Sequence, residues 1–299
     1  MRGDRRQLLP RPGDRARLLI TATQGPGTVP LRVRKRRIRP LDLLGPIAIL
    51  GVFLATWQWI SAGLPDQRDF LVPSPGEVWR EGFADAAIRS EVFHAAYQTS
   101  REALSGLLLA MLIGVGLAIM MTQAKWIERS VFPWAVILQT IPILALVPFI
   151  KVRYGVDFRA RVIVCLLIAV FPIITNTLFG LQSADEGHHD LFTLHSAGRR
   201  RRLTKLLLPG ALPAMFTGFR ISAGLSVVGA IVGEFFFRSG ETGLGHLIEK
   251  YRARTQFYPA LFATIIVTCA LGVIIFVVFS IVGSRSTRNW YEAAAASRE

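Results

Sequence analysis

The residues of this sequence that could carry out chemistry are few, and their arrangement argues against a metal or catalytic site. Three histidines, His188, His189 and His195, lie close together, but no cysteine accompanies them, and two adjacent histidines seldom complete a metal site. The two cysteines, Cys165 and Cys269, lie in separate apolar stretches. The sequence therefore predicts neither a disulfide framework nor a bound metal.

Sequence signatures of nucleotide-driven and hydrolytic chemistry are absent as well. None of the five lysines follows a glycine, which excludes the phosphate-binding pattern Gly-x-x-x-x-Gly-Lys-Ser/Thr. The metalloprotease pattern His-Glu-x-x-His and the hydrolase pattern Gly-x-Ser-x-Gly are also missing. We therefore expect a chain that is not an enzyme and holds no cofactor of its own.

Ionisable side chains inside apolar stretches are a different signal. Glu234 follows Arg220 by 14 residues, about 21 Å along a helix, and we expect it to be the only acidic group at membrane depth. Such a group usually faces protein or water, so Glu234 is a candidate for a transport pathway or gate, with a structural ion pair as the alternative. Gln139, Pro142 and Arg101 are further candidates on the same argument.

These residues belong to a chain that is apolar enough to cross a membrane repeatedly. Of its 299 residues, 52% are hydrophobic and only 18% are charged, against about 25% charged in soluble domains. Several stretches without charges, and one containing only Arg220 and Glu234, are long enough to cross about 30 Å of hydrocarbon as helices. The sequence predicts an all-α membrane protein with six spans, near residues 41–60, 95–121, 131–150, 162–179, 214–237 and 259–282.

The distribution of positive charge predicts the orientation of these spans. With the N-terminus inside, the inner segments hold 22 Lys and Arg and the outer loops 11, so both termini should be cytoplasmic. The basic outer loop 151–161 is the exception. The net charge of +15 could also indicate a nucleic-acid binder, but the Arg-rich residues 1–40 show no reader fold. We expect them to form a disordered cytoplasmic tail attracted to anionic membrane lipids.

The segment between the fourth and fifth predicted spans, about residues 185–212, carries the strongest functional signal. We expect a short helix from about Asp190 to Gly198, because Asp190 then lies near the positive end of the helix dipole and four arginines lie beyond the other end. Leu191, Leu194 and His195 fall at i, i+3 and i+4, so one face can present an apolar knob to a partner groove. An ordinary basic loop is the alternative.

This segment resembles the cytoplasmic coupling segment, the EAA loop, of binding-protein-dependent ABC permeases. That pattern has an acidic residue, two small residues, a glycine four positions further on, and an apolar-x-Leu-Pro ending. Leu-Phe replaces the small pair here and Ser replaces the glycine, as in one variant of the nitrate, sulfonate, taurine and thiamine-precursor branch. The resemblance assigns the ATPase-coupling helix and the loop ending to Asp190, Leu191, Phe192, Leu194, His195, Ser196, Ala197, Gly198, Leu206, Leu208 and Pro209.

Other landmarks of the same branch occur in order along residues 41–292. They are Pro73-Ser74-Pro75 with Val78-Trp79, Thr217-Gly-Phe-Arg-Ile221, Val232-Gly-Glu234 and Gly243-Leu-Gly245. The resemblance implies the type I ABC importer permease fold for residues 41–292, followed by a short tail, 293–299. It also implies a homodimeric pore in the bacterial cytoplasmic membrane, two ABC ATPase subunits that bind ATP and Mg, and an extracytoplasmic substrate-binding protein.

The function implied by the resemblance is that of an ABC importer permease for a small polar or anionic organic solute. Sulfonate, nitrate, taurine and vitamin precursors remain open, and the variant loop with Trp290-Tyr291-Glu292 favours a heterocyclic vitamin precursor. A stand-alone secondary transporter is the main alternative, but Glu234 alone offers little coupling-ion chemistry. An intramembrane enzyme lacks its signatures, and a structural or sensory membrane protein would form no stable complex with an ATPase.

Overall fold

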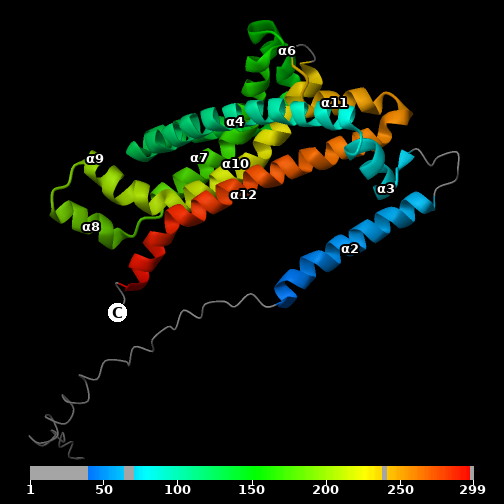
Figure 1. The fold of residues 1–299 in the computed structure, drawn as a ribbon. Helices are drawn as coiled ribbons and strands as arrows, with labels where there is room; N and C mark the ends of the chain where they lie inside the picture. Colours follow the sequence, from blue (N-terminus) through cyan, green and yellow to red (C-terminus); the bar gives the residue numbers. More distant parts are fainter. Residues whose placement is uncertain (1–39, 64–70, 238–240, 297–299) are drawn as a thin grey trace, which may run out of the picture.

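The computed structural model describes residues 40–63, 71–237 and 241–296 (Figure 1). The predicted N-terminal tail, apart from Pro40, lies outside these residues, as do the last three residues and the side chains of Trp290, Tyr291 and Glu292. The described residues fold almost entirely into helices joined by short turns, which confirms the all-α class.

Five helices are long and apolar enough to cross a membrane, and a sixth crossing is possible if a bent pair counts as one span. The five are α2 (Pro40–Ala62), α4 (Ala86–Gln123), α7 (Phe158–Gln182), α10 (Leu208–Phe236) and α12 (Tyr258–Ala296). The bent pair is α5 (Lys125–Thr140) and α6 (Ile143–Tyr154). Shorter elements are α3 (Pro75–Glu77), η2 (Val78–Phe83), α8 (Glu186–Leu194), α9 (Arg199–Arg202), η3 (Leu203–Leu207), α11 (Leu244–Arg252) and η4 (Thr255–Phe257).

The third predicted span is broken rather than straight. The axes of α5 and α6 meet at 98°, so the span expected over residues 131–150 is a bent pair of helices rather than a single one. Pro142 explains the break, because a proline disfavours the helical conformation in the residue before it and lacks an N–H. Ile141 is accordingly extended, with ψ 125°, and Pro142 begins the new helix as its N-cap.

Two helix starts differ from the sequence expectation for identifiable local reasons. α4 begins at Ala86, well before residue 95, because the Asp85 carboxylate caps it by accepting hydrogen bonds from the N–H groups of Ala87 and Ile88. α10 begins at Leu208 and is preceded by the wide turn η3. Pro209, in its first turn, lacks the N–H that a regular helix would need, and a wider turn accommodates that loss.

The centre of the bundle is α7, which packs between α4 and α10, while α12 packs along α10 (Figure 1). Close approach depends on glycine at the crossings: a Cβ on Gly106 of α4 would lie 3.0 Å from the Val162 carbonyl oxygen, and one on Gly229 of α10 would lie 2.8 Å from Cys165 Cα. Cys165 is itself fully buried in the main apolar core.

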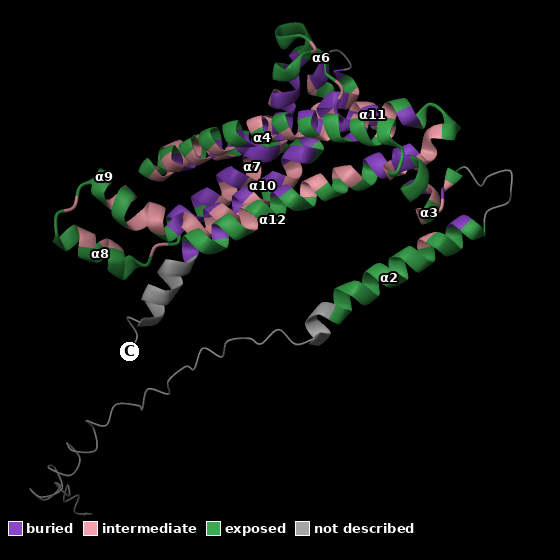
Figure 2. Cartoon of the chain, viewed as in Figure 1, coloured by how far each residue is buried: buried purple, intermediate pink, exposed green. Residues whose placement is uncertain are grey.

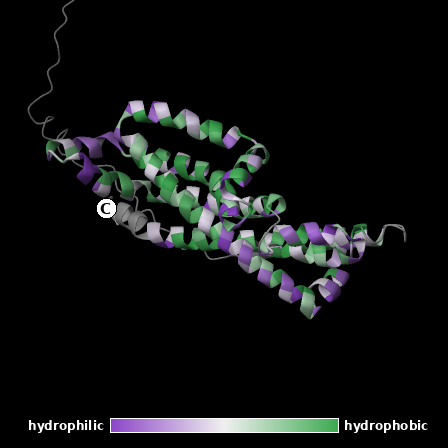
Figure 3. Ribbon diagram, turned by 90° about the horizontal axis from the view of Figure 1, so that it is seen from above, coloured by the Kyte–Doolittle hydropathy of each residue, from purple (hydrophilic) through white to green (hydrophobic). Residues whose placement is uncertain are grey.

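Apolar side chains cover the outside of the bundle as well as its core. Figure 2 shows α2 exposed along most of its length. Large apolar side chains are exposed on α2, for example Phe53 and Trp59, and on α12, for example Val273. Hydrophobic residues dominate the middle of the bundle, whereas hydrophilic residues are more frequent toward its two ends (Figure 3). This surface suits lipid or protein contact rather than water.

The two ends of the bundle carry different elements. α8 and α9 lie at one end, near the end of α12, and α6 and α11 lie at the other (Figure 1). The sequence features singled out above therefore separate into two sites: the coupling segment at the α8 end, and Glu234 at the α11 end.

Candidate functional site

The coupling segment forms a short exposed helix, α8, whose bounds differ from the prediction. The helix begins at Glu186 and ends at Leu194, about four residues earlier at each end than the expected 190–198. Asp185 rather than Asp190 provides the N-terminal cap, since its carboxylate accepts a 2.8 Å hydrogen bond from the Gly187 N–H. Asp190 lies within the helix and is exposed.

The C-terminus of α8 is closed by a Schellman motif centred on Ser196. The Ser196 N–H donates to the Thr193 carbonyl and the Ala197 N–H to the Phe192 carbonyl, both at 2.9 Å. Ser196 has φ 47°, the left-handed conformation that favours glycine. Ser196 is also the position at which the EAA pattern has a glycine, so this turn gives a physical reason for that glycine. It also ends the helix before Ala197 and Gly198.

One face of α8 presents apolar side chains to the outside. The Leu194 side chain is 82% exposed and that of Leu191 50% exposed. His195, next to Leu194, is exposed too, and its Nδ1 lies 3.0 Å from the Leu191 carbonyl oxygen. The face formed by Leu191, Leu194 and His195, here called the α8 knob, is therefore accessible to a partner.

A short turn and one hydrogen bond join α8 to a membrane-crossing helix. Arg202, in α9, donates a 3.0 Å hydrogen bond to the Thr193 hydroxyl at the end of α8. α9 and η3 run without a break into α10. Leu203 and Leu208 pack against the main core, so the segment that follows α8 is anchored in the bundle.

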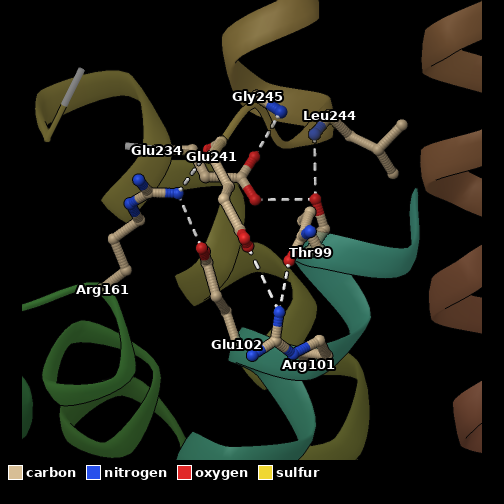
Figure 4. A network of polar contacts seen from close by, with 9 residues as sticks. Thr99, Arg101, Glu102, Arg161, Glu234, Glu241, Leu244 and Gly245 are labelled. Atoms are coloured by element: carbon tan, nitrogen blue, oxygen red, sulfur yellow. Dashed lines mark hydrogen bonds and ion pairs between the residues drawn. The ribbon is translucent and has the colours of Figure 1, made fainter. Parts of the chain in front are cut away.

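At the opposite end, Glu234 is buried in a polar network rather than exposed to a channel of this subunit. It is 1% exposed, and its carboxylate accepts hydrogen bonds from the Thr99 hydroxyl at 2.6 Å and the Gly245 N–H at 2.5 Å (Figure 4). The Leu244 N–H donates in turn to the Thr99 hydroxyl oxygen at 2.9 Å. The carboxylate thus lies against the N-terminus of α11, where the free N–H groups and the helix dipole favour negative charge.

Two sequence landmarks meet in this contact. Val232-Gly-Glu234 ends α10, and Gly243-Leu-Gly245 begins α11. A Cβ at Gly243 would lie 2.6 Å from Glu234 Oε2 and closer still to Oε1, and a Cβ at Gly245 would lie 2.9 Å from Oε2. The glycines of the second landmark therefore make room for the carboxylate of the first.

A buried ion pair lies beside Glu234 in the same network. Arg161 donates to the Glu102 carboxylate at 2.6 Å, and their side chains are only 4% and 3% exposed. Arg161 also donates to the Glu241 carbonyl oxygen at 3.1 Å (Figure 4). Because breaking a buried pair leaves one charge without compensation, these two residues should tie α4 to α7 strongly.

The ion pair corrects two sequence expectations. Glu234 is not the only acidic group at membrane depth, since Glu102 lies within the predicted second span and is 2% exposed. Arg161, which the topology placed in a basic outer loop, is buried in the first turn of α7. The sequence showed only that Glu102 and Arg161 lie at the ends of apolar stretches. Sequence spacing alone could not show that these two residues form an ion pair.

The other pathway candidates fall at two places. Arg101 belongs to the edge of the network, where it contacts the Glu241 carboxylate at 3.2 Å and the Gln98 side chain at 2.9 Å. Gln139 and Pro142 are exposed and flank the break between α5 and α6. The structure therefore brings Arg101 and Glu234 into one region and leaves Gln139 and Pro142 at another. Among the described residues, no group of three metal-binding side chains comes together.

Comparison with known proteins agrees with this architecture. The family of binding-protein-dependent transport system inner membrane components matches residues 107–288. The chain is 32% identical over 238 residues to the formylaminopyrimidine transport permease protein ThiX of Halalkalibacterium halodurans, covering 79% of this chain and 92% of that protein. It is 29% identical to the putative aliphatic sulfonates transport permease protein SsuC of Bacillus subtilis, covering 74% and 78%.

The fold is also found in a solved transporter. An inward-facing structure of the MetNI methionine ABC transporter superimposes with a TM-score of 0.59, covering 68% of this chain and 99% of that chain at 17% sequence identity. This likeness concerns the fold alone and confirms the type I importer permease architecture. Given the family match over residues 107–288 and the relatives aligned along most of their length, the chain belongs to the binding-protein-dependent transport system inner membrane components and is the multi-pass permease subunit of an ABC importer.

Proposed function

We propose that this permease couples ATP hydrolysis in a separate ATPase to solute import through α8. The observation that carries the proposal is the α8 knob, in which Leu194 is 82% exposed. α8 is hydrogen-bonded to α9, and α9 and η3 run without a break into α10. An exposed apolar side chain on a short helix fits a groove of a partner protein. Movement of that groove would displace α10 and so change the packing of the spans.

The proposed assembly contains two copies of the chain, two ATPase subunits and one extracytoplasmic binding protein. The α8 end, with Arg199 to Arg202 and the end of α12, would face the cytoplasm, in agreement with the excess of positive charge there. The end that carries α6, α11 and Glu234 would then face outward, where a binding protein delivers the solute. In this arrangement both termini are cytoplasmic.

The proposed solute is small, and polar or anionic. The relative ThiX is named for formylaminopyrimidine transport and aligns over 92% of its length, which supports the heterocyclic vitamin precursor favoured above. SsuC is named for aliphatic sulfonates and aligns less completely, so a sulfonate is the second candidate. The ligand bound by the cognate binding protein would decide between them.

The pathway candidates remain part of this proposal. Glu234, with Arg101 near it, would act as a gate element at the outer end by holding the N-terminus of α11. Gln139 and Pro142 flank the 98° break between α5 and α6. The backbone hydrogen bonds are already interrupted there, so the angle between the two helices could change during transport at little further cost.

The test uses the whole transporter, reconstituted in liposomes with its ATPase and binding protein. Leu194→Asp should abolish ATP-dependent uptake and co-purification of the ATPase, because a charge would enter an apolar contact. The matched control is Val152→Asp, which places the same charge at a 90% exposed position on α6, at the opposite end. ATPase binding and uptake unchanged by Leu194→Asp would refute the coupling role.

A further inference from the structure

A positive charge lies near the middle of α10, with an aromatic ring beside it and no acidic partner among the described residues. Arg220 is about 18 Å along the helix from Leu208 and about 24 Å from Phe236, within a segment that qualifies as a membrane span. Its guanidinium lies 5.5 Å from the centre of the Phe276 ring. It forms no hydrogen bond or ion pair with any residue that the structure describes. A guanidinium at such depth is costly unless water or an anion compensates it.

A cavity with both polar and apolar walls adjoins this charge. Its volume is about 240 Å³, and it lies between α10 and α12. Thr217 and Arg220 from α10 face Ser280, Ser284 and Thr287 from α12, which share one helix face at i, i+4 and i+7. Phe216 and Gly283 also line it. None of the lining residues is acidic, so the cavity has a net positive charge.

The hydroxyl groups of this cavity are not equivalent. Thr217, Ser284 and Thr287 each donate to a carbonyl of their own helix, at 3.0, 2.9 and 2.9 Å. A hydroxyl has a single proton to donate, so these three offer only their oxygens to a ligand in this arrangement. Ser280 has no such bond within the described residues. Arg220 and Ser280 are therefore the available donors, and both favour an acceptor that carries negative charge.

We propose that Arg220 and Ser280 form a binding site for an oxyanion group. The volume is roughly eight times the ~30 Å³ that one water molecule occupies in the liquid, which suits a nitrate, sulfonate or phosphate group rather than a drug-sized molecule. Such a group has two sources in a membrane transporter: a free anion moving through the pore, or the phosphate of a lipid. The first source rests on the proposed transport function, and the second does not.

The experiment measures anion binding to the full chain in phosphatidylcholine nanodiscs, without ATPase. The free probes are methanesulfonate and nitrate, followed by calorimetric titration. The lipid probe is phosphatidylglycerol mixed into the nanodisc and counted by native mass spectrometry. Wild-type protein should bind at least one probe, and Arg220→Gln should weaken that binding about tenfold or more. Arg220→Lys should recover part of it, because lysine keeps the charge but loses the planar fork.

A matched control separates a local site from overall charge. Arg252→Gln removes the same charge from the surface of α11, where Arg252 pairs with Glu249 at 2.8 Å, and should leave binding unchanged. Binding of a free anion assigns the site to the pore, and binding of phosphatidylglycerol alone assigns it to a lipid. Failure of every probe to bind, or equal binding by wild type and Arg220→Gln, overturns the proposal. Co-purification with the ATPase, measured separately, tests the coupling role independently of this result.

Discussion

Glu234 occupies the space that a side chain at position 243 would require. A Cβ on Gly243 would lie 2.6 Å from Glu234 Oε2, although the two residues are nine positions apart in the sequence. The carboxylate accepts a hydrogen bond from the Gly245 N–H and is buried from solvent. α10 and α11 are therefore joined through a charge placed at a helix N-terminus, and the missing side chain at Gly243 is what permits it.

Gly243→Ala should detach α11 from α10. The added methyl group cannot fit beside the carboxylate, and displacing a buried carboxylate from its hydrogen bonds should cost about 1–3 kcal/mol. Hydrogen exchange at the Leu244 and Gly245 amides, which donate to Thr99 and Glu234, should become faster.

The matched control for this substitution is Gly224→Ala, because a Cβ at Gly224 meets no atom within 4 Å. That variant should show exchange like the wild type at α11. If Gly243→Ala also left the two amides unchanged, the close contact with Glu234 would be disproved.

The Glu102–Arg161 pair should show strong coupling in a double-mutant cycle. Arg161→Met alone leaves the Glu102 carboxylate buried without its partner and should destabilise the protein by about 3–5 kcal/mol. Glu102→Leu with Arg161→Met removes both charges together and should recover much of that loss. The stability of each variant can be followed by unfolding in mixed micelles of mild and denaturing detergent.

Arg153→Met is the control for the ion-pair cycle. Arg153 lies at the exposed end of α6, where its guanidinium stacks on Tyr154 at 5.2 Å, so the change should cost little. Additive losses in the Glu102 and Arg161 single and double variants would show that the two residues do not interact.

Ser196→Gly should stabilise the end of α8. A residue with a Cβ at φ 47° loses about 1–2 kcal/mol in the left-handed region, while glycine adds entropy to the unfolded chain. The net gain should be about 0.5–1 kcal/mol, seen as about two- to fivefold slower exchange of the Ser196 and Ala197 amides. Ser196→Val should have the opposite effect, and the same exchange rate in all three proteins would contradict the Schellman turn.

The sequence predicted the helical membrane fold and the exposed coupling segment, but it misplaced several boundaries. Apolar stretches and the positions of the charges were sufficient to find the spans, because crossing hydrocarbon restricts the backbone to few solutions. The start of α8 was missed because Asp185, five residues before Asp190, competes as the N-cap. The break at Pro142 could have been inferred from the proline itself.

The polar network could not be predicted, because it joins residues distant in sequence. Glu102 and Arg161 lie 59 positions apart, and Thr99 and Glu234 lie 135 apart. From the sequence, each of these residues could be identified only as a charged or hydroxyl side chain near the end of an apolar stretch. Their pairing depends on the close packing of α4, α7 and α10, which sequence spacing does not determine.

Glu234→Gln distinguishes a gate from a purely structural support. Glutamine keeps one acceptor oxygen for the Gly245 N–H, but its amide nitrogen cannot accept from the Thr99 hydroxyl, so one of two hydrogen bonds to the carboxylate is lost. Losing a charge-assisted hydrogen bond costs about 1.5–3 kcal/mol. Thr99→Val removes the same bond from the other side and preserves the Glu234 charge, but it also removes the acceptor of the Leu244 N–H. It is therefore the comparison variant with the greater expected loss of stability and an unchanged charge.

If Glu234 gates the pathway, liposomes with the Glu234→Gln transporter should leak solute or show slower ATP-driven uptake. This effect should be much larger than that of Thr99→Val, although Thr99→Val is expected to lose more stability. If the residue only supports α11, both variants should lose stability and uptake in the same proportion. Uptake with wild-type kinetics in Glu234→Gln would exclude a gating role for Glu234. A neutral amide would then support transport as well as the negative charge does.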